Sequence, residues 1–363
     1  MNLLFLHKAG GRGGAENALV HTAAALARHA SCRMAAAAAT PGEMVDKLRA
    51  LGLPVSLFPM PEWRRWLERP RFAWSVRRIA RAYAGERIDV VVSNEFWRAP
   101  HAVALARRLG CRSAVILRDG NSTPEKARRY RLHEADRLIP ISFRLQEELA
   151  ADAVLAAKMR VVHDAVSPPP PPGARREQIA ALLAERPARR WLLCLGAVGF
   201  RKDQISCVRV LKELHRRGLG DCGLLLAGAL EPAYEKPLRQ AIREAGLEEY
   251  VVLAGHVPDI GSLFEACTLS LLTSTQEGCP LSITETLLAG RPAFAYEMAG
   301  SLDTLGPVGP FVSERAPAAL ADRIAAYLND PAALAPQVEA LREQARTRFA
   351  EAPHARAFLE ALA

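Results

Sequence analysis

Two carboxylates eight positions apart stand out in the stretch EGCPLSITE, which runs from Glu277 to Glu285. A Gly-Cys-Pro turn separates them, and the apolar run that follows is typical of a helix. One acid therefore precedes the turn, and the other lies inside the helix that the turn begins. Because ionised carboxylates accept strong hydrogen bonds from hydroxyl groups, the pair could hold a hydroxyl-rich ligand. The structural alternative is a surface turn followed by a helix-capping glutamate.

Two further polar groups follow apolar runs in the same half of the chain. Arg201-Lys202 stands in the loop after residues 191–196, and His256-Val257 follows residues 250–255. Taken singly, the first pair also fits a solvated basic turn and the histidine also fits a structural role. Together with the two carboxylates they favour one shared site, provided that the fold brings these loops together.

A glycine-rich loop that includes Gly13 and Gly14 opens a helical pattern near the start of the chain. Free backbone N–H groups at a helix start suit a phosphate. The loop lacks the Gly-Lys-Ser/Thr ending of a P-loop, and Glu16 interrupts the G-x-G-x-x-G dinucleotide pattern. It therefore fits either a ligand cradle or a tight structural turn.

The elements that must position these residues are short apolar runs alternating with alanine- and leucine-rich helical patterns. Strands that are apolar nearly throughout indicate parallel sheets covered on both faces, and two such series predict two doubly wound α/β domains. In that architecture ligands bind beyond the carboxyl ends of the strands, where all the loops above lie. The predicted strands are residues 2–7, 32–38, 54–59, 89–94, 113–119, 137–142, 160–164, 191–196, 222–228, 250–255, 269–274 and 291–296.

Five consecutive prolines within residues 167–173 predict a stiff linker between the two domains. The predicted N-terminal domain is 1–166 and the C-terminal domain is 174–345, with residues 346–363 forming a helix that packs back on the first domain. Charge supports this division. Residues 1–150 contain 25 Lys and Arg against 14 Asp and Glu, whereas the rest of the chain contains 23 against 25.

The motifs resemble those of the family-4 retaining glycosyltransferases of the GT-B fold, in which two Rossmann-like domains face a central cleft. The carboxylate pair beside a Gly-Pro turn, followed by TLLAGRPAFA, is the most specific part of this resemblance. Other stretches agree in order and spacing: GGAE at 13–16, ADRLIPIS at 135–142, VVHDAV at 161–166, the G-x5-K spacing at 196–202 and LAGHVPD at 253–259.

The resemblance implies transfer of a sugar, with retention of configuration, from a UDP- or GDP-sugar to an acceptor hydroxyl of a glycan or lipid-linked acceptor. It implies that Glu277 holds the donor sugar, Glu285 holds the ribose and Lys202 neutralises the leaving diphosphate. The other donor-binding candidates are Arg201, Gly278, Cys279, Pro280, Leu281, Ser282, His256, Val257, Gly13 and Gly14.

Two positions depart from the family pattern. The family normally places an arginine after the strand glycine, where this chain has Ala197, and Arg201 could supply the missing charge. Many relatives place a histidine where this chain has Arg118, which makes Arg118 a catalytic candidate that binds phosphate or sugar. Asn94 and Asp119 are candidates for the acceptor side.

These departures leave open a degenerate, non-catalytic nucleotide-sugar-binding protein. An NAD-dependent oxidoreductase using the glycine loop is a further alternative, but it lacks an acid at the end of the second predicted strand. A net charge of +9 suggests nucleic acid, yet no nucleic-acid module is recognisable, so no nucleic-acid partner is expected. The sequence predicts no cofactor and no metal site, because cations and a helix dipole serve instead.

Residues 63–83 contain seven arginines and three tryptophans, a composition typical of a segment at a membrane interface. The alternative is an ordinary amphipathic helix whose Trp74 and Ile79 face the core. Seven scattered cysteines and no long apolar run predict a cytoplasmic protein, peripherally bound to the inner face of the plasma membrane if residues 63–83 contact anionic lipid.

Overall fold

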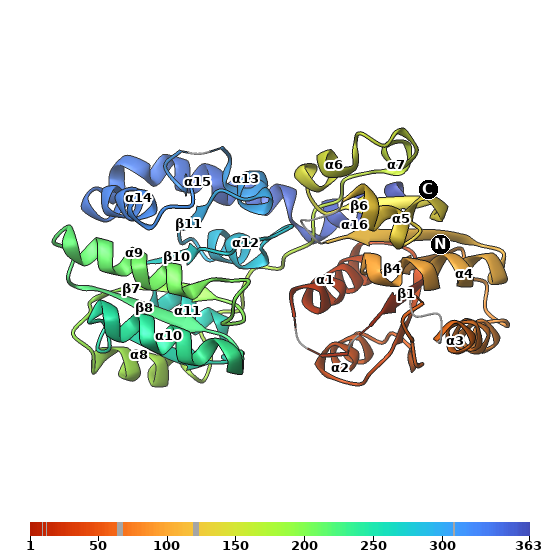
Figure 1. Ribbon diagram of the computed structural model, residues 1–363, viewed down its shortest axis with the longest axis horizontal. Coiled ribbons are helices and arrows are strands. Elements are labelled where there is room, and N and C mark those ends of the chain that lie inside the picture. Colours follow the sequence, from red (N-terminus) through yellow and green to blue (C-terminus); the bar gives the residue numbers. More distant parts are fainter. Residues whose placement is uncertain (9, 12, 64–67, 119–122, 308) are drawn as a thin grey trace. The chain divides into compact units, whose positions relative to one another are not determined.

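The computed structural model describes residues 1–363 apart from 9, 12, 64–67, 119–122 and 308. The chain divides into two compact units. Unit 1 consists of Met1–Val166 and Arg348–Ala363, and unit 2 consists of Ser167–Thr347. In each unit, helices cover both faces of one parallel sheet (Figure 1).

The sheet of unit 1 has six parallel strands in the order β3-β2-β1-β4-β5-β6. The central strand β1 pairs with β2 on one side and with β4 on the other. The strand order therefore reverses between β1 and β4, and in such sheets this switch point is where ligands bind. The strands are β1 (Asn2–His7), β2 (Arg33–Ala38), β3 (Val55–Leu57), β4 (Val90–Ser93), β5 (Arg112–Leu117) and β6 (Arg137–Pro140).

Most helices of unit 1 lie between consecutive parallel strands, and α16 returns to the unit from the end of the chain. They are α1 (Gly14–His29), α2 (Glu43–Ala50), α3 (Arg69–Ala82), η2 (Phe96–Arg98), α4 (Ala99–Leu109), α5 (Pro124–Arg129), η3 (Leu132–Glu134), α6 (Phe143–Leu149), α7 (Ala153–Lys158) and α16 (Glu351–Leu362).

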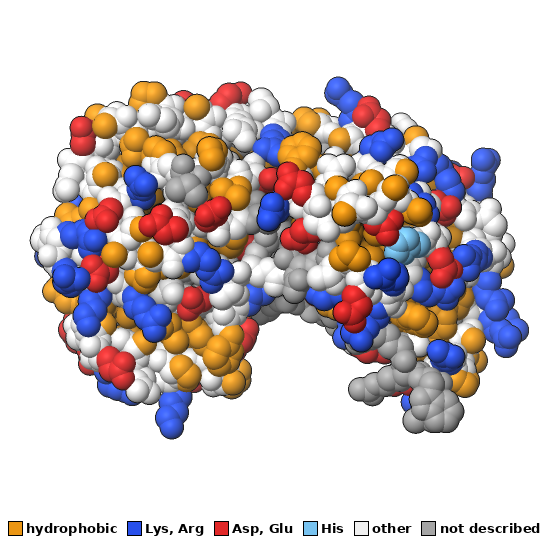
Figure 2. Space-filling view, turned by 45° about the horizontal axis from the view of Figure 1, so that its top comes forward, with side chains coloured by type: hydrophobic (Ala, Val, Ile, Leu, Met, Phe, Trp, Pro, Cys, Tyr) orange, Lys and Arg blue, Asp and Glu red, His pale blue; other side chains and the backbone are white. Residues whose placement is uncertain are grey.

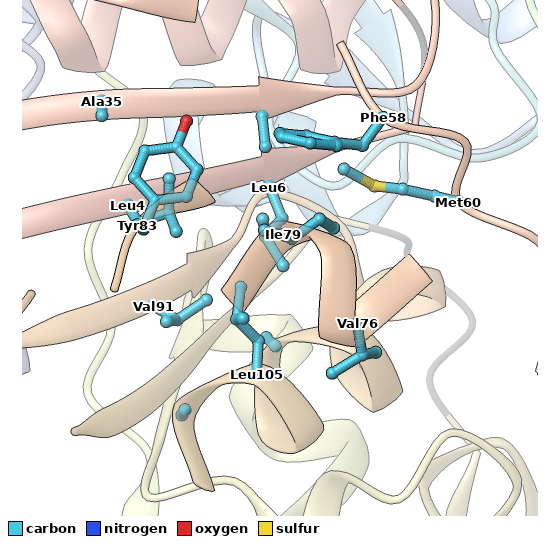
Figure 3. Packing of buried hydrophobic residues seen from close by; sticks show 13 residues of the cluster. Leu4, Leu6, Ala35, Phe58, Met60, Val76, Ile79, Tyr83, Val91 and Leu105 are labelled. Atoms are coloured by element: carbon cyan, nitrogen blue, oxygen red, sulfur yellow. The ribbon is translucent and has the colours of Figure 1, made fainter. Parts of the chain in front are cut away.

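One face of this sheet packs against α3 and α4 through a buried apolar cluster (Figure 3). Leu4 and Leu6 of β1 meet Val76 and Ile79 of α3, and all four side chains are almost fully buried. Trp74 lies on the other side of α3, with 52% of its surface exposed. The alternative of an ordinary amphipathic helix therefore describes Ile79, which faces the core, but not Trp74, which is exposed.

Unit 2 repeats the same topology. Its six parallel strands have the order β12-β11-β10-β7-β8-β9, so the order reverses between β7 and β10. The strands are β7 (Arg190–Leu195), β8 (Cys222–Ala227), β9 (Val251–Gly255), β10 (Leu269–Leu272), β11 (Ala293–Tyr296) and β12 (Val312–Ser313). The helices are α8 (Arg176–Ala184), α9 (Gln204–Arg216), α10 (Pro232–Ala245), α11 (Ile260–Ala266), α12 (Leu281–Leu288), α13 (Ala299–Leu305), α14 (Pro317–Asn329) and α15 (Pro331–Arg348).

The proline-rich segment is anchored on unit 2. The N–H groups of Gly173 and Arg175 donate to the carboxylate of Asp259, which also caps α11. On unit 1, α16 packs on α1, and the ring of His354 bridges the carbonyl of His163 (2.7 Å) and the hydroxyl of Thr22 (3.2 Å). Burial lowers the pKa of His354, so a neutral ring that donates at one nitrogen and accepts at the other fits both contacts.

The α/β class and the two doubly wound sheets agree with the prediction from sequence. Two strand assignments do not. Residues 160–164 run beside β6 without forming a strand. Arg160 and Val162 donate hydrogen bonds to β6, but by Val166 the backbone donates to Phe349 instead. The short strand β12 was not predicted, since its two residues, Val312 and Ser313, carry too little pattern to be recognised.

Across the residues that the structure describes, no helix is long and apolar enough to cross a membrane.

Candidate nucleotide-sugar site

The loops after β7 and β10 meet at the switch point of unit 2 and bring two cations to one carboxylate. Glu277 is 8% exposed, and its Oε1 lies 2.8 Å from Nζ of Lys202, at angles that fit an ion pair better than a directed hydrogen bond. Arg201 donates to Oε2 of Glu277 at 3.3 Å and keeps 56% of its side chain exposed. The structure thus brings Arg201 and Lys202, which share one loop, into contact with Glu277 of the other loop.

The backbone of the first loop is specialised for presenting Lys202. Gly196, which ends the strand, has φ = 134°, a value that side-chain-bearing residues rarely adopt, and an added Cβ would lie 3.1 Å from Cε of Lys202. Asp203 adopts the left-handed region (φ = 51°) although it is not glycine. Its carbonyl accepts from the hydroxyl of Thr273 at 2.8 Å, which fixes the loop to the end of β10.

Electrostatics keep Glu277 ionised. Burial alone would raise the pKa of its carboxyl, but the charges of Lys202 and Arg201 outweigh burial and hold the pKa below its usual value. Removing one partner from a buried pair leaves an uncompensated charge, which typically costs about 3–5 kcal/mol. The ion pair is therefore both a structural restraint and a set of charges ready to contact a ligand.

The predicted turn lies between Glu277 and α12. The N–H of Gly300 donates to the carbonyl of Glu277 at 3.2 Å and holds the turn in place. Pro280 occupies the N-cap position of α12, where no side chain caps the helix. Its first N–H groups, around Leu281 and Ser282, therefore offer the positive end of a helix dipole to an anion. Gly278 is buried and Cys279 is half-buried beside them.

Glu285 lies one turn into α12 and is half-buried. Desolvation raises the pKa of its carboxyl to about 7, although the charge of Lys202 acts in the opposite direction. Two acids eight residues apart thus have different protonation behaviour, because Glu277 has close cationic partners and Glu285 is influenced by Lys202 only at longer range.

Other predicted donor residues belong to the end of a different strand. His256 and Val257 follow β9, an edge strand that β8 separates from β7, and His256 is exposed. Sequence reasoning missed Arg315, which donates to the carbonyl of Thr275 at 2.9 Å in the loop that leads to Glu277. Its position follows from β12, the strand that was not predicted.

In unit 1, the ends of β1 and β4 carry a buried polar network. His7 is 1% exposed and lies 3.2 Å from Oε1 of Glu16 and 3.1 Å from the amide of Asn94. The hydrogen bond and the charge of His7 outweigh burial and lower the pKa of Glu16. An added Cβ on Gly13 would lie 2.3 Å from Glu16, so glycine leaves room for this carboxylate, whereas Gly14 has open space around it.

Arg118 is engaged inside the protein. Its guanidinium forms a bidentate pair with Asp164 and donates to the carbonyl and side-chain oxygen of Asn94. Asn94 is fully buried, so its place in the structure is to hold Arg118 and His7 rather than to face solvent. Asp119 lies outside the described residues. The pairing of Arg118 with Asp164 left no signal in the sequence.

Among the side chains that the structure describes, no group of three or more His, Cys, Asp or Glu residues is arranged to hold a metal ion.

Models of two known protein families together match nearly the whole chain. Residues 13–165 match the description "Glycosyl transferase 4-like domain", and residues 175–348 match "Glycosyl transferases group 1". Among solved structures, the chain resembles Anabaena Alr3699/HepE in complex with UDP-glucose (TM-score 0.80, 21% identity, 100% of this chain and 99% of that one). It also resembles a glycosyltransferase from Rickettsia africae (TM-score 0.82, 16% identity, 99% and 97%).

At these identities the structural likeness establishes the fold, which is GT-B. The chain belongs to the group 1 glycosyltransferase family, with a glycosyltransferase 4-like N-terminal half. The family and fold predicted from the motifs are thereby confirmed.

Two curated relatives cover part of the chain. The 2-deoxystreptamine glucosyltransferase of Streptomyces kanamyceticus is 28% identical over 235 residues, which is 61% of this chain and 58% of that protein. The lipopolysaccharide core biosynthesis mannosyltransferase LpcC of Rhizobium leguminosarum bv. viciae is 30% identical over 170 residues, which is 45% and 48%. The chain thus spans about half of the length of these relatives.

The raised pKa of Glu285 predicts a pH-dependent stability. Its carboxyl binds a proton more tightly in the folded protein (pKa about 7) than its ordinary value of 4.5 allows. The resulting stabilisation is complete below pH 4.5 and is lost as the pH rises through 7. Glu285→Gln should therefore raise the melting temperature at pH 8, by an amount equivalent to roughly 3 kcal/mol at most, and should raise it much less, by the equivalent of about 1 kcal/mol or less, at pH 5.

Thermal denaturation between pH 5 and 8.5 measures this effect. Replacing the exposed Glu248 by Gln is the matched control and should shift the curve at neither pH. Identical pH profiles for the wild type and Glu285→Gln would contradict the assignment.

The position of Arg201 predicts a role in diphosphate binding. Arg201→Ala should weaken the binding of UDP or GDP about tenfold, equivalent to about 1.4 kcal/mol, because a charge-assisted contact is lost. Ala197 is exposed and has room for a longer side chain, so Ala197→Arg in the Arg201→Ala background should restore part of the affinity. Titration calorimetry measures both changes, with Arg209→Ala on the exposed face of α9 as the control. Unchanged affinity in Arg201→Ala would refute the compensation by Arg201.

Proposed function

We propose that this protein transfers a sugar, with retention of configuration, from a nucleotide-diphosphate sugar to an acceptor hydroxyl. The observation that carries the proposal is the contact between Lys202 and Glu277 at the switch point of unit 2, next to the uncapped start of α12. A cation, a carboxylate and a helix N-terminus match the diphosphate and the sugar hydroxyls of such a donor. Relatives named as glucosyl- and mannosyltransferases support the same chemistry.

Each group has a role in this reaction. The N–H groups at the start of α12 bind the diphosphate, while Lys202 and Arg201 neutralise the charge that develops as the bond from the sugar to phosphate breaks. Glu277 accepts hydrogen bonds from the transferred sugar, and Glu285 accepts them from the ribose. The acceptor oxygen attacks the anomeric carbon from the side of the leaving group, whose phosphate takes the acceptor proton.

The donor-site residues suggest how binding depends on pH. An ionised carboxylate accepts stronger hydrogen bonds from the ribose hydroxyls than a protonated carboxyl does, so affinity for an intact UDP- or GDP-sugar should rise as Glu285 loses its proton near pH 7. The charge needed at the diphosphate comes from side chains and a helix dipole in this proposal, and no divalent metal is required.

A non-catalytic nucleotide-sugar-binding protein is the second candidate. Two observations favour it: Ala197 stands where the family has an arginine, and Arg118 is tied to Asp164 instead of being presented to a substrate. Such a protein would bind the donor without consuming it, which separates it from the enzyme in a single assay.

We further propose that the protein works on the cytoplasmic side of a membrane, where α3 contacts anionic lipid. The acceptor in this proposal is a glycan or a lipid-linked glycan. The outer face of this helix carries the exposed side chains of Arg71, Trp74, Arg77 and Arg81. In Figure 2, blue Lys and Arg side chains cover much of the visible surface of unit 1, at the right. Arginines beside an exposed tryptophan suit a lipid headgroup layer. Arg64 and Arg65 of the same stretch lie outside the described residues.

The transfer reaction is tested with a panel of UDP-, GDP- and ADP-sugars, by following nucleotide release with and without acceptor glycans. Glu277→Gln and Lys202→Met should each lower turnover about 100- to 1,000-fold, because each removes a charge that stabilises the transition state. Transfer by the wild type should persist in excess EDTA.

Asp221→Asn is the matched control, because Asp221 pairs with Arg190 at the amino end of the same strand that presents Lys202 at its carboxyl end. It should retain wild-type turnover. Wild-type turnover in both site variants would refute the site, and loss of activity in EDTA that Mg²⁺ restores would refute the metal-free mechanism. Donor binding without any turnover would select the second candidate.

Membrane contact predicts salt-sensitive binding to liposomes. The protein should sediment with anionic vesicles at low salt and dissociate at about 0.5 M NaCl, where the Debye length is only about 4 Å. Replacing Arg71, Arg77 and Arg81 by Gln should reduce this binding, since each basic residue near the surface contributes about 1 kcal/mol. Trp74→Ala should reduce it as well.

The charge-matched control replaces three exposed arginines of unit 2, Arg209, Arg239 and Arg243, by Gln. This variant has the same net charge as the α3 variant and should bind vesicles as the wild type does. No binding to anionic vesicles at low salt would contradict the contact.

A further inference from the structure

Unit 1 has an exposed tryptophan beside its own switch point. Trp97 stands in η2, the turn that follows β4, and 38% of its surface is exposed. Two buried rings hold it: the centroid of Phe96 lies 3.9 Å away and that of Tyr130 lies 5.3 Å away, almost perpendicular to it. Phe96 and Tyr130 also pack on each other at 4.9 Å, so the indole belongs to a rigid three-ring cluster. A flat apolar surface that is held so firmly loses little entropy when it binds a ligand.

Two residues next to Trp97 in the sequence, Glu95 and Arg98, each have a polar atom that lacks a hydrogen-bond partner in the described part of the chain. Oε2 of Glu95 is buried and unpartnered, and it lies 3.7 Å from Nδ1 of His7. Nε of Arg98 is also buried and unpartnered, and the Arg98 side chain is 3% exposed. Buried polar groups without partners are rare in proteins and mark places where a ligand can supply the missing contacts. Glu95 and Arg98 stand on either side of Trp97 in the sequence, at the start and the end of the same short turn.

The charges around this turn are already balanced. Arg118 pairs with Asp164, and Lys8 lies 3.8 Å from Glu62. Among the carboxylates that interact electrostatically with Arg98, Glu95 has the largest effect and Glu62 the next largest. Each of these cations has a carboxylate close by, which disfavours a phosphate or another anion as the ligand. An exposed aromatic face and a carboxylate presented by the same short turn suit a neutral ligand that has both apolar C–H faces and hydroxyl groups.

We propose that Trp97 and Glu95 form a binding subsite for a neutral pyranose ring of the acceptor. The sugar stacks on the indole through its C–H face, and one of its hydroxyl groups donates to the carboxylate of Glu95. This inference rests on the proposed glycosyl transfer and names the acceptor class: a glycan with a neutral sugar at the site of transfer. Trp97 and Glu95 contact the acceptor, while Phe96, Tyr130 and His7 position them.

The test measures the binding of neutral sugars without any donor. Maltose, cellobiose, lactose, chitobiose and methyl α-mannoside are titrated against the full-length protein by saturation-transfer NMR and calorimetry. At least one should bind the wild type, and Trp97→Ala should weaken that binding at least about tenfold. Trp97→Phe, which keeps an aromatic face, should recover part of the affinity, and Glu95→Gln should weaken it several-fold.

Trp74→Ala is the matched control, because Trp74 is a more exposed tryptophan of the same unit, on α3. It should leave sugar binding unchanged. In transfer assays, Trp97→Ala should raise KM for the acceptor while leaving KM for the donor and the hydrolysis of the donor unchanged. The melting temperature of each variant shows whether it is folded, and Trp97→Phe keeps the test valid if Trp97→Ala is not.

The outcomes separate this inference from the proposed function. Sugar binding that does not depend on Trp97, or no binding of any sugar in the panel, overturns the subsite even if donor hydrolysis is found. Trp97-dependent sugar binding without any donor binding or hydrolysis supports the subsite and refutes the proposed transfer reaction.

Discussion

The pairing of β7 with β10 is the constraint on which the rest of unit 2 depends. These strands are not consecutive in the sequence, and their parallel alignment brings the loop with Lys202 against the loop with Glu277. Burying this ion pair is costly unless both charges are present and correctly placed. The left-handed Asp203 and the bond from Thr273 to its carbonyl are explained by that requirement, because they fix the loop that presents Lys202. Stability alone does not explain such a pair, since well-packed apolar residues of similar volume would often serve stability as well.

Unit 1 has the same strand order, but its polar residues are used differently. At its switch point the charges are satisfied internally: Arg118 pairs with Asp164, and His7 lies between Glu16 and Asn94. In unit 2 the exposed Arg201 and the uncapped start of α12 are still able to contact an anion. The difference fits a donor that carries two phosphates on one unit and a neutral acceptor on the other. Topology places the two sites, and the pairing of charges decides what each can bind.

Much of the fold could be predicted from the sequence because it depends on local pattern. Uniformly apolar runs predicted most strands, and β1 was predicted at its observed limits, residues 2–7. The prediction failed where the apolar pattern of a segment is short, or where a residue's partners are distant in the sequence. β12 has only two residues, and residues 160–164 are extended without completing a strand. In the site, the family motif identified Glu277 and Lys202, but no local signal could show that Asp164 engages Arg118 or that Trp74 points away from the core.

The excess positive charge of unit 1 is a property of its outer surface and not of its switch point. At the switch point, positive side chains are matched by Glu16, Glu95 and Asp164, whereas α3 presents several arginines outward with no acidic residue in its first turn. Val76 and Ile79 fill the buried face of this helix, so the arginines and Trp74 contribute little to the core. Two exposed tryptophans among the described residues of the unit therefore differ in their neighbours: Trp74 has Arg78 over its ring, whereas Trp97 belongs to the turn that Glu95 begins. The two proposals for unit 1, contact with an anionic membrane and binding of a neutral sugar, therefore rest on different residues with different surrounding charges.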